Sequence, residues 1–148
     1  MKKTLLSTLY FQNAAEQLLE DSAGFLRANW NNSPRQSEEV RALFTHMIYA
    51  LQRRNWSRII INQVGMRPFS REEQHWVAQE WLPMAVQAGY GHGAIVGSRD
   101  VMVRLATAYI TTHMQSLPLI YQSFETEAEA LEWLLRQPHS PQLQRKLS

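Results

Sequence analysis

The chain has 148 residues, enough for one domain with a sizeable core, and its 45% apolar and 19% charged residues are ordinary for a globular protein. Fifteen Lys and Arg residues against 13 Asp and Glu residues leave a formal charge of +2, and no sustained basic block predicts nucleic-acid binding. The absence of Cys excludes disulfides, thiol nucleophiles and cysteine-based metal sites, and it suits the cytoplasmic location that we expect. No run approaches the ~20 apolar residues of a membrane span.

The stretch MKKTLLSTLYFQNAA has two interpretations. Its two lysines and apolar residues resemble a signal peptide, but Ser7 and Thr8 interrupt a core that usually needs about 7–15 apolar residues. Alternation and aromatic content favour a strand over residues 5–11. Residues 16–21 and 25–30 flank DSAG, where Gly24 can take a positive φ, so we expect a hairpin. A helix over AAEQLLED remains an alternative, because these residues favour helices.

A helix is expected after NNSPRQSEEV, with Ser37 as its N-cap and Glu38 and Glu39 in its first turn, where the helix dipole favours negative charge. Its apolar face carries Val40, Leu43, Phe44, Met47 and Leu51. The β-branched run in SRIIINQV then predicts a strand buried on both faces.

A long helix is expected to begin after Ser70 and to stop at Gly89. Its apolar side would carry Val77, Trp81, Met84, Ala85 and Ala88. Pro83 lies inside this helix and removes one backbone donor, which predicts a kink near Gln79–Glu80.

The remaining chain predicts a strand in 91–98, a helix over 100–115, a strand in 117–124 and a final helix capped by Thr126. The helix over 100–115 would carry Val101, Leu105, Ala108 and Tyr109 on its apolar face. We expect one domain over residues 1–137 and a polar tail over 138–148. The fold class is α/β: a mixed sheet with an antiparallel N-terminal hairpin and parallel β-α-β units, covered by about four helices.

Three blocks, SREEQHWVAQEWLPMAVQAG, AIVGSRD and SFETEAEALEWLL, resemble the STAS-like proteins allied to SpoIIAA, which are small bacterial α/β domains. The resemblance covers about residues 25–136 and rests on packing motifs rather than catalytic ones. In anti-sigma-factor antagonists of this class, a Ser at the start of a helix is phosphorylated, and Ser70 is similar in topological position. Those proteins carry an Asp before that Ser, where this chain has Phe69, and related proteins often end the preceding strand with Asp, where this chain has Asn62.

Ser70 has both a structural and a functional interpretation. The pattern S-R-E-E is a capping box in which Ser70 and Glu73 satisfy each other's backbone amides. A phosphate or other anion at the same helix start would lie beside Arg67 and Arg71, although Glu72 and Glu73 would oppose it.

Other motifs carry weaker chemistry. GYGHG lies after a helix and before a strand, the reverse of a dinucleotide-binding loop, whereas VGSRD has the right order and could hold an anion near Ser98 and Arg99. Glu72-x-x-His75 has the spacing of half a di-metal carboxylate site, but no second copy is present. We expect no metal and no cofactor. There is no G-x-S-x-G, although scattered Ser, His and Asp residues could still converge in space.

The sequence leaves two main functional hypotheses. The first is a non-enzymatic regulatory or protein-interaction module whose partner is another protein or a second copy of this chain. Its contact surface would lie around Ser70, Arg71, His75 and Trp76. The second is a domain that binds a small anion or lipid-like ligand at the C-terminal strand ends, near Asn62, Arg67 and Ser98. An enzyme ranks third.

Overall fold

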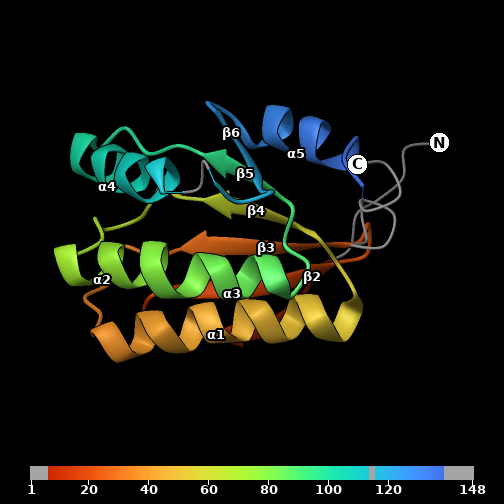
Figure 1. Cartoon of the computed structure of the whole chain (residues 1–148). Coiled ribbons are helices and arrows are strands. Elements are labelled where there is room, and N and C mark those ends of the chain that lie inside the picture. The colour runs from red at the N-terminus through yellow and green to blue at the C-terminus, as the bar shows by residue number, and fades with distance from the viewer. Residues whose placement is uncertain (1–6, 114–115, 139–148) are drawn as a thin grey trace.

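The computed structural model describes residues 7–113 and 116–138, which form one six-stranded sheet flanked by helices (Figure 1). The spatial order of the strands follows the chain, from β1 to β6. The first three strands pair antiparallel, and β3 to β6 pair parallel. This arrangement confirms the predicted α/β class, with the N-terminal hairpin extending a parallel sheet.

The three antiparallel strands are β1 (Ser7–Gln12), β2 (Glu16–Asp21) and β3 (Phe25–Trp30), and β2 and β3 form the predicted hairpin. The helical alternative for AAEQLLED is wrong, because β2 pairs along its whole length with β1 and β3. Gly24 has the positive φ, 91°, that the turn requires. Residues 1–6 lie outside the described residues, so the expected strand is observed from Ser7 onward.

Helix α1 (Ser37–Arg54) crosses from β3 to β4 (Arg58–Asn62). Its N-cap is Gln36 rather than the predicted Ser37, and the carboxylate of Glu39 accepts the Gln36 amide at 2.9 Å. The five apolar residues predicted on one face of this helix are all buried. Strand β4 is buried from Arg58 to Ile61, as expected for a central parallel strand.

The helix after Ser70 is continuous but changes its winding. It consists of α2 (Arg71–Trp76), a π-helical turn η1 (Val77–Trp81) and α3 (Leu82–Gln87). The amide of Leu82 donates to the carbonyl of Val77, one residue further back than in an α-helix, immediately before Pro83. The irregularity predicted near Gln79–Glu80 is therefore a π turn. The extra residue shifts the following turn around the axis, so Leu82 is buried and Met84, predicted on the apolar side, is 47% exposed.

The last elements are β5 (His92–Val96), α4 (Val101–Thr112), β6 (Ile120–Phe124) and α5 (Glu127–Leu135). The apolar face predicted for α4 is wrong. The residues that α4 buries are Val103, Ala106 and Ile110, whereas Val101, Leu105, Ala108 and Tyr109 are exposed. Thr126 caps α5 as predicted, accepting the Glu129 amide at 3.2 Å. Residues 139–148 of the predicted tail lie outside the described residues.

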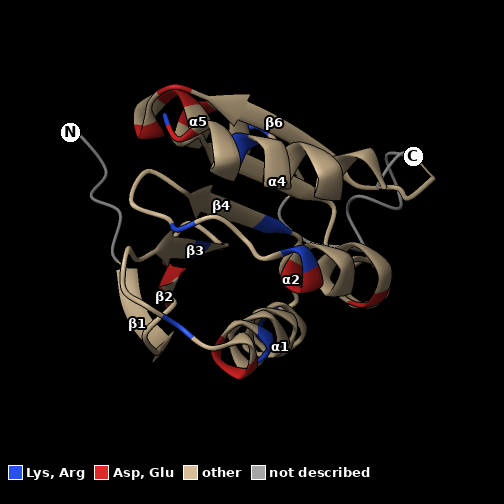
Figure 2. Ribbon diagram, turned by 90° about the vertical axis from the view of Figure 1, so that its left-hand side faces the viewer, with Lys and Arg blue, Asp and Glu red and all other residues tan. Residues whose placement is uncertain are grey.

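The sheet separates two layers of helices. Figure 2, which is turned to look along the strands, shows α1, α2 and α4 on one side and α5 on the other. The larger core lies under α1, α2–α3 and α4, and a smaller one joins Phe25, Ile60, Ala94 and Val96 to α5. No helix among the described residues is long and apolar enough to cross a membrane.

Candidate functional site

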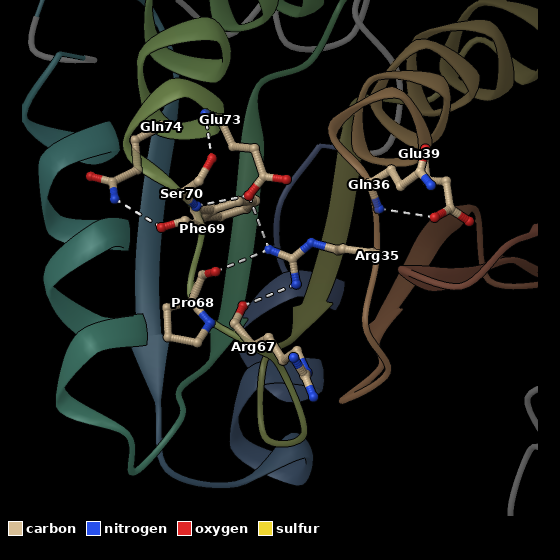
Figure 3. A network of polar contacts seen from close by, with 9 residues as sticks. All are labelled: Arg35, Gln36, Glu39, Arg67, Pro68, Phe69, Ser70, Glu73 and Gln74. Atoms are coloured by element: carbon tan, nitrogen blue, oxygen red, sulfur yellow. Dashed lines mark hydrogen bonds and ion pairs between the residues drawn. The ribbon is translucent and has the colours of Figure 1, made fainter.

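The start of α2 forms the capping box that the sequence predicts (Figure 3). The Ser70 hydroxyl accepts the Glu73 amide at 3.1 Å, and the Glu73 carboxylate accepts the Ser70 amide at 2.8 Å. Two of the amides that a helix start leaves without an intrahelical acceptor are thus satisfied within the chain. Ser70 itself lies at the surface, in a shallow pocket that it shares with Arg35 and Arg67.

Arg35 ties this cap to the loop before it. Its guanidinium donates to the carbonyl of Arg67 at 3.2 Å, to the carbonyl of Pro68 at 3.1 Å and to the Glu73 carboxylate at 3.2 Å (Figure 3). The side chain is 5% exposed and lies over the rings of Trp30 and Phe69. Sequence reasoning missed Arg35, because its partners lie more than thirty residues away and no local pattern marks them.

A buried carboxyl lies near the same cation. Glu16, on β2, is fully buried, and neither of its carboxyl oxygens has a hydrogen-bond partner among the described residues. Burial raises the pKa of Glu16 well above its ordinary 4.5, and the charge of Arg35 opposes this rise. Arg35 Nε is also buried and has no hydrogen-bond partner in the part of the chain that the structure describes. The capping box therefore lies close to buried polar atoms, those of Glu16 and Arg35 Nε, that have no hydrogen-bond partner among the described residues.

Three predicted site residues of α2 line a different concavity. Arg71, His75 and Trp76 line a groove of about 790 Å³ together with Arg41 of α1 and Tyr109 of α4. The Arg41 guanidinium lies 5.4 Å from the Trp76 ring centroid and 3.4 Å from the Glu72 carboxylate. Trp76 is half-buried against Phe44, whereas Trp81 is core, as the sequence predicts.

The outward side of α4 continues this apolar surface. Its large exposed side chains are Val101, Met102, Leu105 and Tyr109, with exposed fractions between 39% and 60%. Arg104 is the one charged residue within α4, and Figure 2 draws this helix almost wholly in the tan of uncharged residues. We define the α2–α4 face as Trp76 together with these four residues of α4.

A third concave surface lies at the C-terminal ends of the parallel strands. This groove, of about 1050 Å³, is formed by the loops after β4, β5 and β6 and includes Arg99, Arg104 and Thr126. Ser98 lines it, but its hydroxyl accepts the Asp100 amide at 3.0 Å and shapes the loop before α4. Asn62 plays a similar part after β4, where its side-chain oxygen accepts the Val64 amide at 3.0 Å. The structure therefore distributes six of the seven predicted site residues over three surfaces, and Asn62 lines none of them.

Arg67 belongs to the pocket beside Ser70 rather than to that groove, and its Nε donates to the Asn32 carbonyl at 2.9 Å. Asn32 borders both concavities. The interior also contains a cavity of about 40 Å³ between the sheet and the helices, bordered by Gln63, Thr107 and Tyr121. This space suits water-sized groups, since one water needs about 10–15 Å³ of such volume.

In the described part of the chain, no three His, Asp or Glu side chains lie close enough together to hold a metal ion. Glu72 and His75 share the α2 groove but gain no third ligand from another helix. The sites described above consist of guanidinium groups, capped helix ends and apolar side chains.

Comparison of this chain with protein-family models, with curated proteins and with solved structures found no match in any of the three.

Proposed function

We propose that this chain is a non-enzymatic regulatory or protein-interaction module that binds a protein partner through the α2–α4 face. The observation that carries the proposal is the outer surface of α4, where four apolar side chains are exposed next to one another: Val101, Met102, Leu105 and Tyr109. The helix contains a single charged residue, Arg104. Large contiguous patches of exposed apolar side chains mark interaction sites, whereas single scattered ones are normal on protein surfaces.

Trp76 and its surroundings extend the same face with the chemistry of an interface. A half-buried Trp presents a large flat surface at little cost in conformational entropy. Arg41, Arg71, Glu72 and Glu80 border the groove beside it, so an apolar centre has a charged rim of both signs. A partner would insert apolar side chains over Leu105 and Tyr109 and place polar groups at this rim.

Site-specific photo-crosslinking tests the proposal. A photo-reactive residue at Leu105, introduced into the full chain in cells that express it naturally, should give one discrete crosslinked species. The same residue at Tyr49, which is 54% exposed on α1, is the matched control and should give none. In the chain that carries the photo-reactive residue at Leu105, Met102→Lys should reduce capture by roughly ten-fold or more without changing thermal stability, because it places a charge within the apolar face and Met102 is 60% exposed.

Equal crosslinking at Leu105 and Tyr49, or capture that survives Met102→Lys, would contradict the proposal.

A second candidate function is the binding of a small anion in the groove at the C-terminal strand ends. It is favoured by Arg99 and Arg104, which border the groove together with the N-cap residues of α4 and α5, Asp100 and Thr126. Asp100 and Glu125 also border it and would oppose an anion. A lipid-like ligand has less support, because the interior cavity of about 40 Å³ is far smaller than an acyl chain.

Isothermal titration of the full chain with inorganic phosphate tests this candidate. Measurable binding that is lost in Arg99→Gln and Arg104→Gln would support it. Heat exchange no greater than dilution, or binding unchanged in both variants, would remove it.

A further inference from the structure

We propose that two copies of this chain associate through β6, pairing antiparallel about a two-fold axis at Gln122 so that two sheets become one. Strand β6 is an edge strand of the sheet, and its outer edge pairs with no strand in the described ranges 7–113 and 116–138. Figure 1 shows β6 at the margin of the sheet, beyond β5. This inference is independent of the α2–α4 face.

The backbone of β6 presents a self-complementary set of donors and acceptors. The Ile120 amide donates to Gly91 at 3.0 Å, and the Phe124 carbonyl accepts the Gly97 amide at 3.1 Å. Because backbone groups alternate in direction along a strand, those of Tyr121 and Ser123 point away from β5. Antiparallel pairing about a two-fold axis at Gln122 places Tyr121 of each copy opposite Ser123 of the partner subunit. In each of these two pairs, both backbone amides donate to the carbonyl of the facing residue.

The side chains match in the same register. Ile120 is 55% exposed, and it would lie opposite Phe124 of the partner subunit in a non-hydrogen-bonded pair, where side chains approach most closely. Phe124 already packs against Trp133 of α5, with ring centroids 5.8 Å apart, so Ile120 would complete an apolar surface. The two Gln122 amides would meet on the axis and can hydrogen-bond to each other.

The features that normally block an exposed strand edge are missing from β6. At the other margin of the sheet, β1 carries a register irregularity between Leu9 and Phe11, a common device against edge pairing. Strand β6 has continuous register and contains no charged residue and no Pro. Self-pairing therefore brings no like charges together within the strand, which favours a second copy as the occupant.

The contact made by one five-residue strand is small. It would bury less than the ~800 Å² per partner of a standard stable interface, so we expect a weak, concentration-dependent dimer. Sedimentation velocity of the full chain, from micromolar to near-millimolar concentration, should show a monomer–dimer equilibrium.

Two kinds of variant locate the contact. Ser123→Pro removes an outward amide that β5 does not use, and it should raise the dimer dissociation constant by roughly ten-fold or more through two lost hydrogen bonds. Gln122→Lys and Gln122→Glu should each weaken the dimer by placing like charges on the axis, and their equimolar mixture should restore it. Thr8→Lys, at the opposite sheet edge, is the control and should leave association unchanged, as should Leu105→Lys.

A chain that stays monomeric at every concentration overturns the proposal. So does a dimer that Gln122→Lys leaves unchanged, or one that Thr8→Lys or Leu105→Lys weakens equally, because each result places the contact elsewhere. Restoration by the charge-paired mixture cannot arise from misfolding, so the proposal stays testable even if Ser123→Pro does not fold.

Discussion

Ser70 and Glu73 satisfy each other's amides, and Arg35 holds that pair to the loop before it. The Ser70 hydroxyl is therefore occupied as an acceptor in a structural role. Its surface position still leaves it beside two guanidinium groups, those of Arg35 and Arg67. At the scale of single residues, the cap contributes stability whether or not an anion ever binds beside it.

Replacement of Ser70 should show the size of this contribution. Ser70→Ala should lower the free energy of unfolding by about 1 kcal/mol, because the Glu73 amide loses its acceptor, whereas Ser70→Asp should retain most of the stability. Urea unfolding followed by circular dichroism measures both. Ser33→Ala, in the exposed loop before α1, serves as the control and should change stability little.

The buried Glu16 should make stability depend on pH. Its pKa in the folded chain is raised, so its stabilising effect is fully present below about pH 4.5 and is lost as pH rises toward the folded-state pKa. Relative to Glu16→Gln, the unmodified chain should lose up to about 1.4 kcal/mol per pH unit in that window. Urea unfolding at pH 4, 6 and 8 measures the difference.

The exposed Glu132 provides the matched control, and Glu132→Gln should not reproduce the effect of Glu16→Gln. An equal stability difference at all three pH values would contradict a raised Glu16 pKa.

Among the elements, α4 differs most from its sequence-based interpretation. It has apolar residues on both sides, so periodicity could not decide which side meets the sheet. The structure turns Val103, Ala106 and Ile110 inward and leaves the predicted stripe at the surface. The proposed interaction surface consists of residues that this orientation of α4 leaves exposed.

Paired truncations test the orientation of α4. Ile110→Ala should lower the free energy of unfolding by about 2–4 kcal/mol, because it removes a buried side chain from the larger core. Leu105→Ala should change it by no more than about 0.5 kcal/mol, because Leu105 is 59% exposed. If the two costs were reversed, the predicted face would be the buried one.

Across the whole molecule, Arg58 joins segments that are far apart in the chain. Its guanidinium donates to the carbonyls of Ala23 and Gly24 in the hairpin turn and to those of Leu134 and Gln137 at the end of α5. His92 lies beside it in the sheet register, 6.0 Å from the Trp133 ring between centroids. One buried cation thus fastens α5 and the hairpin to the central strands.

This arrangement predicts sensitivity to acid. Burial, and then the charge of Arg58, lower the pKa of His92 below its ordinary 6.5. The unfolded chain therefore binds the proton more readily, and stability present above pH 6.5 falls as pH drops toward the folded-state pKa. Thermal unfolding between pH 7.5 and 5 should show a smaller decline in Tm for His92→Gln than for the unmodified chain.

His75→Gln, on the exposed side of α2, is the control and should leave the decline unchanged. Parallel declines for the unmodified chain and His92→Gln would show that His92 does not cause it.

The sequence alone determined the order of the elements, the hairpin around Gly24, the buried face of α1 and the capping box at Ser70. These features depend on signals within a few residues, such as alternation, helical spacing and reciprocal caps. The irregularity before Pro83 belongs to the same class, because a missing amide acts on its own helix.

Only the tertiary structure decided which side of α4 is buried and which residues after the π turn are buried in the core. It also decided which carboxyl and guanidinium groups lie close together. Glu16 of β2, Arg35 of the loop before α1 and Glu73 of α2 come together from three separate segments. Arg58 contacts both the hairpin turn and the end of α5. The physical reason is that these contacts depend on how whole faces pack against one sheet, which no short stretch of sequence specifies.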